Sequence, residues 1–223
     1  KSFVRLLNRA NISFGVLGNE ESCTGDPAKR AGNEFLFQMQ ALTNIKTLNS
    51  YNVKKIVTAC PHCFNTIKNE YPGLGGSYEV VHHTQLLDEL ISIGKIKISN
   101  DSFKGKRITF HDPCYLGRHN NEYDAPRNVL QSVLKGGIIK EMEQSKSESF
   151  CCGAGGGNMW YEIKTGDRIN QNRVGQAVDT NAKTIAAACN FCNIMLEDGV
   201  KTTGNEENIK VIDIAEMVSK SLG

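Results

Sequence analysis

Eight cysteines are the side chains of this sequence with the most evident capacity for chemistry. They are Cys23, Cys60, Cys63, Cys114, Cys151, Cys152, Cys189 and Cys192. Four of them form two Cys-x-x-Cys pairs, Cys60 with Cys63 and Cys189 with Cys192. Such pairs are more typical of metal or redox sites in reducing compartments than of secreted disulfide frameworks. The spacing therefore favours a metal or redox site in a protein that faces the cytosol.

The five cysteines from Cys114 onward follow the spacing C-x36-C-C-x36-C-x2-C. Thiolates bind zinc or iron–sulfur clusters, and the number of ligands separates these cases. A structural zinc ion takes four ligands, and so does an ordinary [4Fe–4S] cube. Five converging cysteines therefore indicate a larger or irregular iron–sulfur cluster that passes electrons. Scattered buried cysteines would leave the regular spacing unexplained.

The cysteines also mark an internal repeat. Cys23 and Cys151 lie 128 positions apart, and both Cys-x-x-Cys pairs are related by 129 positions. Their flanks agree, because residues 55–60 and 184–189 are both short runs, largely apolar, that end at the first cysteine of a pair. We infer a duplication, with a first repeat over residues 1–100, a second over residues 101–223, and a linker near residues 99–102.

Alternating strand and helix patterns predict that each repeat folds as a parallel α/β lobe. The expected strands cover residues 12–17, 55–59, 78–82, 107–111, 138–142, 184–188 and 210–212. The expected helices cover residues 34–48, 65–71, 84–93, 167–178 and 214–222, with two more after residues 125–126 and after residue 192. Loops at the carboxyl ends of parallel strands converge on one crevice, so we expect the cysteine loops to meet there.

The local sequence around the cysteines suits thiolate ligands. Two cysteines three positions apart at a strand-to-helix turn can aim their sulfurs at one centre, and a helix start favours the thiolate. The glycine run 153–157 lets the backbone approach that centre closely. A nucleotide site is disfavoured, because a glycine fingerprint of that kind opens a helix directly after a strand, without cysteines in front.

Composition excludes other classes of function. The chain has 26 basic and 24 acidic side chains, interspersed, with a formal net charge of +2, which provides no basic stripe for nucleic acid. It has neither the long apolar run of a membrane span nor that of a secretory signal. The chain begins without methionine and shows helical apolar spacing at once. We therefore expect the natural protein to extend upstream.

The run from Cys114 to Cys192, with Gly153 after the paired cysteines, resembles the CCG domain, the cysteine-rich module of heterodisulfide reductase. Similar modules occur in iron–sulfur subunits of glycolate, lactate and glycerol-3-phosphate oxidising systems. Residues 22–27 and 111–118 look closest to oxidoreductases that accompany acyl-CoA dehydrogenases and electron transfer flavoprotein. The resemblance implies transfer of electrons towards a membrane quinone.

The resemblance also implies a non-cubane [4Fe–4S] cluster, held by Cys114, Cys151, Cys152, Cys189 and Cys192. The first motif, with Cys23, Cys60 and Cys63, departs from the pattern, because Thr24 stands where the family has a second cysteine. At the 128 offset, the counterpart of Cys114 falls about 14 residues before Lys1. With that cysteine the first site suits a cube or zinc, and without it the site is incomplete.

Several other side chains near the motifs are candidates for supporting roles. His111 and Asp112 are expected to hydrogen-bond sulfur or orient the loop that follows them. His62 is expected at the surface or in packing, His82 at a turn or helix start, and the aromatic residues 160–161 in packing beside the cysteine loop.

Two other functions remain open from the sequence. One is direct reduction of a disulfide at the cluster, as in heterodisulfide reductase, and the other is a zinc-stabilised binding or assembly module. For the favoured function, the resemblance implies an electron-transfer flavoprotein or another redox subunit as partner, with a quinone reached through the full-length protein. It implies a cytoplasmic location, with the full-length protein associated with the cytoplasmic face of a membrane.

Overall fold

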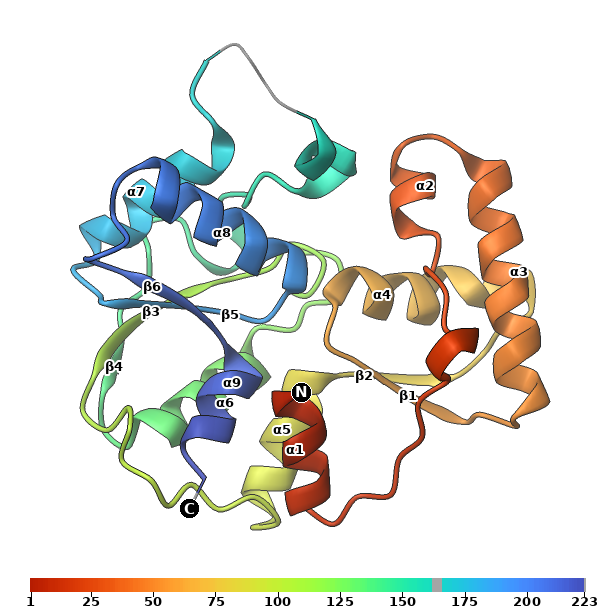
Figure 1. Cartoon of the computed structure of the whole chain (residues 1–223), viewed down its shortest axis with the longest axis horizontal. Coiled ribbons are helices and arrows are strands. Elements are labelled where there is room, and N and C mark those ends of the chain that lie inside the picture. The colour runs from red at the N-terminus through yellow and green to blue at the C-terminus, as the bar shows by residue number, and fades with distance from the viewer. Residues whose placement is uncertain (162–165, 223) are drawn as a thin grey trace.

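The structure, a computed structural model, describes residues 1–161 and 166–222 as two α/β halves that lie side by side (Figure 1). The first half contains α1 (Ser2–Arg9), α2 (Asp26–Arg30), α3 (Glu34–Ser50), β1 (Lys55–Thr58), α4 (Pro61–Asn65), β2 (Glu79–His82) and α5 (His83–Ser92). The second half contains β3 (Arg107–His111), α6 (Asp124–Leu134), β4 (Ile138–Ile139), α7 (Ile169–Asp179), β5 (Thr184–Ala187), α8 (Asn190–Thr202), β6 (Lys210–Asp213) and α9 (Ile214–Lys220).

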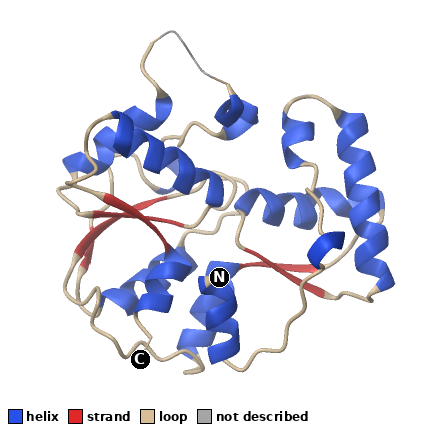
Figure 2. Ribbon diagram, in the orientation of Figure 1, coloured by secondary structure: helices blue, strands red, loops and turns tan. Residues whose placement is uncertain are grey.

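Every strand pair in the described residues is parallel, as the sequence predicts (Figure 2). The first half has the pair β1-β2, with Ile56 opposite Val80. The second half has a four-stranded sheet in the order β4-β3-β5-β6. The chain leaves β3 for β4 on one side and returns to β5 on the other. The carboxyl ends of β3 and β5 therefore flank a switch point, where α/β sheets bind ligands.

The prediction of a strand over residues 12–17 is wrong. These residues run without regular structure into a short helix, Gly18–Glu20, and Val16 is 74% exposed. In the second half the matching strand, β4, pairs only with β3, and it spans two residues rather than 138–142. The repeat offset puts the counterpart of β3 before Lys1, so no strand in the described residues is there to satisfy the backbone of 12–17.

The other predicted elements form, with adjusted ends. The helix expected over 34–48 begins after Asn33, whose side chain accepts a hydrogen bond from the Leu36 N–H at 3.0 Å. The helix expected over 65–71 instead begins at Pro61, because proline suits a first helical turn, and it widens into a π-helical turn at Thr66–Glu70. In residues 1–161 and 166–222, no helix has the length and apolar character that crossing a bilayer requires.

The two halves share one apolar core. Helix α5 of the first half packs against α6 of the second, and α9 of the second packs against α1 of the first. Leu6, Leu87, Leu130 and Met217, one from each of these helices, are fully buried in the same cluster. The two contacts are equivalent under the duplication, because α1 and α6 occupy matching positions in the two repeats, as do α5 and α9. Each contact therefore joins a helix of one half to a helix of the other. This packing leaves the carboxyl ends of the two sheets facing each other.

Candidate metal centre

The five cysteines of the second motif come from three loops at the carboxyl edge of the second sheet. Cys114 lies beyond β3, and Cys151 and Cys152 lie in the long segment after β4. Cys189 is the N-cap of α8, and Cys192 lies in the first turn of that helix. All eight cysteines of the chain are free thiols, and Cys152, Cys189 and Cys192 are buried. The strand-end placement expected from the sequence is therefore present.

The thiols of the two halves make one continuous array. Successive neighbours interact in the order Cys63, Cys60, Cys189, Cys192, Cys152 and Cys151. The Cys-x-x-Cys pair of the first half thus lies directly beside that of the second half. Cys23 stands apart as an exposed thiol. The two motifs therefore lie next to each other at the boundary between the halves.

The array shares protons unevenly. Hydrogen bonding with Cys192 and Cys60 lowers the pKa of Cys189 to about 5, whereas hydrogen bonding with Cys189 raises the pKa of Cys60 to about 12. Hydrogen bonding with Cys151 and Cys192 similarly lowers the pKa of Cys152. Cys189 and Cys152 therefore favour the thiolate form, which is the form that binds metal, and the protons on the other thiols leave when a metal binds.

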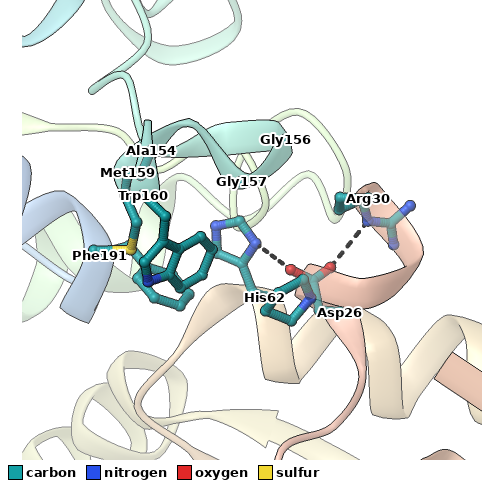
Figure 3. Close-up of a pocket in the computed structure, with 10 residues that line it drawn as sticks. Asp26, Arg30, His62, Ala154, Gly156, Gly157, Met159, Trp160 and Phe191 are labelled. Atoms are coloured by element: carbon teal, nitrogen blue, oxygen red, sulfur yellow. Dashed lines mark hydrogen bonds and ion pairs between the residues drawn. The ribbon is translucent and has the colours of Figure 1, made fainter. Parts of the chain in front are cut away.

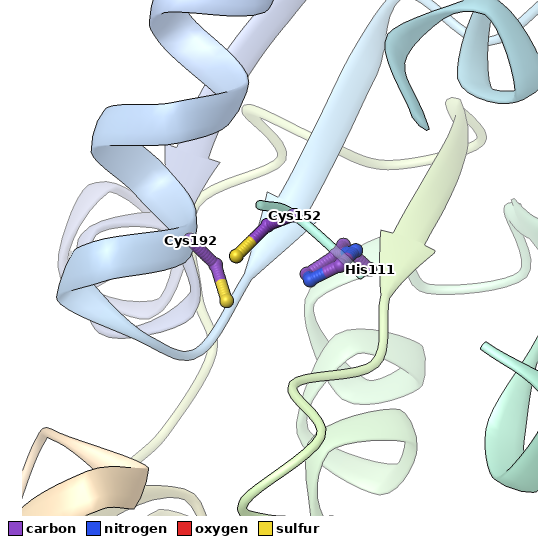
Figure 4. Close-up of side chains that lie close together, drawn as sticks. All are labelled: His111, Cys152 and Cys192. Atoms are coloured by element: carbon purple, nitrogen blue, oxygen red, sulfur yellow. The ribbon is translucent and has the colours of Figure 1, made fainter. Parts of the chain in front are cut away.

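The number and spacing of the ligands distinguish a site for a single metal ion from a site for a cluster. Among the described residues, only His111, Cys152 and Cys192 bring three ligand atoms within 4.8 Å of one another (Figure 4). A zinc ion with bonds of about 2.3 Å would hold tetrahedral sulfur ligands about 3.8 Å apart. No other trio of candidate ligands among the described residues meets the 4.8 Å criterion. The five thiols of the second motif exceed the four ligands that a structural zinc ion takes, which fits a group of several irons.

The turn after the paired cysteines requires glycine. Gly153 has a φ of +94°, and its N–H donates to the Cys151 sulfur at 3.2 Å. A Cβ at this position would lie 3.2 Å from Met195 and 3.3 Å from Ile169. Gly25 repeats the arrangement in the first half, with a φ of +89° and an N–H donated to Cys23 at 3.5 Å. Both repeats therefore aim a backbone donor at a cysteine.

Thr24 occupies the place of the missing cysteine in the first motif. Its hydroxyl donates to the Cys63 sulfur at 3.7 Å. In the second half the matching contact joins Cys152 to Cys192. The first motif thus retains the geometry of the second, with a hydroxyl in place of one thiol.

Asp112 orients the segment that leads to the paired cysteines, rather than the loop that directly follows it in sequence. Its carboxylate accepts the Lys146 N–H at 2.8 Å, and its carbonyl accepts the Ser149 hydroxyl at 3.1 Å. Arg127 donates two hydrogen bonds to the same carboxylate, at 2.8 and 2.9 Å, and two more to Glu141. The segment after β4 is thereby tied to the end of β3.

His111 lies beside Cys152 and Cys192. It also contacts Arg173, a buried cation that the sequence motifs did not single out. The Nε–H of Arg173 donates to His111 Nδ1 at 3.0 Å, and His111 in turn forms a hydrogen bond with Cys152, as predicted for a supporting residue. The signal for Arg173 was its helical register: residues 170, 173, 174 and 177 form the buried face of α7.

A small pocket lies between the halves beside the array (Figure 3). His62 is buried there, so a surface position for it is wrong, whereas a packing role is confirmed by its stacking on Tyr115 at 4.1 Å. Its Nδ1 lies 2.8 Å from Asp26, which also accepts from Arg30 at 3.0 Å. Although burial opposes it, hydrogen bonding with His62 and Arg30 keeps the pKa of Asp26 below its usual value.

Of the remaining sequence predictions, some are confirmed and one is wrong. His82 is the N-cap of α5 and forms a capping box with Gln85, which confirms a helix-start role. Trp160 is 62% exposed, and its packing is limited to the pocket edge, where it lies edge-on to Phe191. Tyr161 is 72% exposed, so the prediction that it packs beside the cysteine loop is wrong.

The sequence is similar to known redox proteins. The chain is 48% identical over its full length to the EtfAB:quinone oxidoreductase of Syntrophomonas wolfei, and 47% identical over 99% of its length to the probable iron-sulfur-binding oxidoreductase FadF of Bacillus subtilis. It covers 32% and 31% of those proteins. It is 39% identical, over 98% of its length, to a component of the Dihydromethanophenazine:CoB--CoM heterodisulfide reductase of Methanosarcina barkeri, of which it covers 54%.

The chain therefore spans about a third to a half of these relatives. The CCG family, described as Cysteine-rich domain, matches residues 1–68 and 108–197. These two ranges contain all eight cysteines. Since the match takes in most of the chain and all eight of its cysteines, this chain belongs to the CCG family of cysteine-rich domains.

Proposed function

We propose that this chain is the electron-transfer domain of an iron–sulfur oxidoreductase, in which the second motif holds a non-cubane [4Fe–4S] cluster. The ligands would be Cys114, Cys151, Cys152, Cys189 and Cys192. The observation that carries the proposal is that five thiols come from three loops at one edge of the sheet, whereas a structural zinc ion takes only four ligands. An iron–sulfur cluster takes up and releases single electrons.

The surrounding residues suit that role. Burial of Cys152, Cys189 and Cys192 keeps water from the thiolates, and the Gly153 N–H offsets charge on the Cys151 sulfur. We propose that Cys23, Cys60 and Cys63 belong to a second site for iron–sulfur or zinc. The contact between Cys60 and Cys189 favours electron exchange between the two sites.

The names of the relatives suggest partners for the complete protein. We propose a reduced flavoprotein, such as electron transfer flavoprotein, as the donor and a quinone as the acceptor, because one relative is named EtfAB:quinone oxidoreductase. Two single-electron transfers together with two protons reduce one quinone to quinol. Another relative is named as a probable membrane-anchored ferredoxin, so we propose that the domain works at the cytoplasmic face of a membrane.

A second candidate function is reduction of a disulfide directly at the cluster. Similarity to a component of a heterodisulfide reductase favours it. Two electrons and two protons would convert one disulfide into two thiols. Comparing anaerobic turnover of a quinone analogue with that of a small mixed disulfide, using the complete protein, distinguishes the two functions.

Iron and acid-labile sulfide in anaerobically purified protein test the proposal. We expect brown protein with about four irons at the second motif. Cys189→Ser should lose most of this iron, because Cys189 lies at the centre of the array, while the matched variant Cys23→Ser, at an exposed thiol, should retain most of it. Colourless protein that contains stoichiometric zinc and no iron after anaerobic reconstitution would contradict the proposal and favour a zinc-stabilised module.

A further inference from the structure

Arg173 is a buried cation without a carboxylate partner among the described residues. It is fully buried and is the largest of the fully buried side chains. Its donors reach His111 Nδ1 at 3.0 Å, the Gln144 carbonyl at 2.8 Å, Gln176 Oε1 at 2.6 Å and the Ser149 hydroxyl at 3.1 Å. All four acceptors are neutral groups. An isolated buried charge is costly unless an opposite charge offsets it.

The thiolates of the second motif are negative groups that help to offset this charge. Of the charged groups, Asp112 acts most strongly on Arg173, but without a hydrogen bond between them, because the Asp112 carboxylate is held by two hydrogen bonds from Arg127. Cys192, Cys152 and Cys151 follow as electrostatic partners of Arg173. The buried guanidinium is therefore suited to balance the negative charge of a group bound by these thiolates.

The hydrogen bond from Arg173 also fixes the tautomer of His111. Because Nδ1 accepts the Arg173 Nε–H, the proton of the neutral ring must be on Nε2, which is then the nitrogen able to donate. His111 is 1% exposed and lies with Cys152 and Cys192 in one close group (Figure 4). Its hydrogen bond with Cys152 is therefore an N–H donated to sulfur.

The first half lacks this device. At the offset of 129 that relates the Cys-x-x-Cys pairs, the counterpart of Arg173 is Asn44. Asn44 is a neutral side chain that donates to the Cys23 carbonyl at 2.9 Å and to the Tyr71 hydroxyl at 3.1 Å. The buried cation accompanies only the motif with paired cysteines, so it is not a general requirement of the fold.

We propose that Arg173 is a positioning residue that raises the reduction potential of the cluster at the second motif, by holding His111 as an N–H donor to Cys152 and by supplying a buried positive charge. The inference rests on the proposed function. Donors to sulfur and nearby positive charge stabilise the more negative, reduced form, and so favour electron uptake.

Potentiometric titration of the reconstituted protein, followed by electron paramagnetic resonance, tests this inference. Arg173→Gln should lower the midpoint potential. Arg173→Lys should lower it less, because lysine keeps the charge but not the planar donor group that reaches His111. Arg168→Gln is the matched control, since Arg168 is the N-cap of the same helix but pairs with Asp198 at a more exposed site. We expect its potential to equal that of the wild type.

A double-mutant cycle that combines Arg173→Lys with His111→Phe tests whether Arg173 acts through His111. This test remains valid even if the Arg173→Gln variant does not fold. Adding Arg173→Lys to His111→Phe should shift the potential by less than Arg173→Lys does alone, because the donor that Arg173 positions is already gone. Additive shifts, or an Arg173→Lys potential equal to that of Arg168→Gln in iron-loaded protein, would overturn the inference. Absence of iron from the wild-type protein would instead overturn the proposed function, so the two failures are distinguishable.

Discussion

At the scale of single residues, the two repeats differ most clearly at one position. Cys152 lies against Cys192 in the second half, and Thr24 lies against Cys63 in the first. The backbone turn is the same in both, with a glycine N–H donated to the cysteine two positions earlier. The side chain therefore changes from a thiol to a hydroxyl at this position while the backbone turn does not, and we propose that Cys152 is the fifth thiolate of the second site.

Cys152→Ser should alter the cluster without unfolding the protein. Serine is nearly isosteric but is a harder and poorer ligand for iron, and the four remaining cysteines are enough for a cube. We expect a changed electron paramagnetic resonance spectrum of the oxidised protein and slower reduction by a physiological donor. The control Thr24→Cys, which places a thiol beside Cys63, should be comparatively tolerated. An unaltered spectrum and rate in Cys152→Ser would mean that Cys152 is not a ligand.

At the scale of elements, the start of α5 carries two buried histidines. His82 caps the helix, while both ring nitrogens of His83 are fully buried near the Thr58 backbone and Asp213. Burial lowers the pKa of His83 below its usual value and lowers that of His82 further. Both rings are therefore neutral in the folded protein near neutral pH.

His83→Phe should make stability less dependent on pH. An unfolded histidine titrates near pH 6.5, whereas the folded group takes up its proton only at lower pH. The contribution of His83 to stability is therefore fully present above about pH 6.5 and is lost as the pH falls, by up to about 1.4 kcal/mol per pH unit. Anaerobic urea unfolding at pH 7.5 and 5.5 should show a smaller loss for His83→Phe than for the wild type.

Ser92→Ala serves as the control for that comparison, because Ser92 is an exposed, non-titrating residue of the same helix. It should shift stability by the same amount at both pH values. Equal pH dependence in the wild type and His83→Phe would show that His83 does not contribute to acid sensitivity.

At the scale of the whole molecule, the repeats are joined by helices that pack across the boundary between the halves. Leu87 on α5 is fully buried in the cluster that also contains residues of α1, α6 and α9. The segment between the repeats is tied down as well, since the N–H groups of Ser99 and Asn100 donate to the Ser221 carbonyl. We propose that a boundary near residue 100 divides the repeats in sequence and that the two repeats nevertheless unfold together.

Leu87→Ala should destabilise both halves in one transition. Removing a fully buried leucine side chain costs about 2–5 kcal/mol, and the cavity would lie in the core that the halves share. Far-ultraviolet circular dichroism and visible absorption of the anaerobic protein should therefore fall together at a lower urea midpoint. The control Leu42→Ala, at a half-exposed position on α3, should cost less than about 0.5 kcal/mol. Two separated transitions would contradict this expectation.

Much of the candidate site was determined by the sequence alone, because it depends on local patterns. The order of cysteines, the repeat offset and the placement of Cys60 and Cys189 at helix starts all follow from short-range spacing. The strands that precede these two cysteines also form at the expected residues. Patterns of this kind fix an element whenever its residues favour one structure locally and tertiary packing does not oppose it.

Only the tertiary structure decided which groups meet. Cys60 contacts Cys189 across 129 positions, and Arg173 reaches His111 across 62. No local pattern encodes such pairs, because their contact depends on how the two halves pack and on which strands lie side by side. Residues 12–17 also show that tertiary contacts can override a local pattern. Their composition suits a strand, but a strand forms only when a neighbour supplies hydrogen bonds to its backbone.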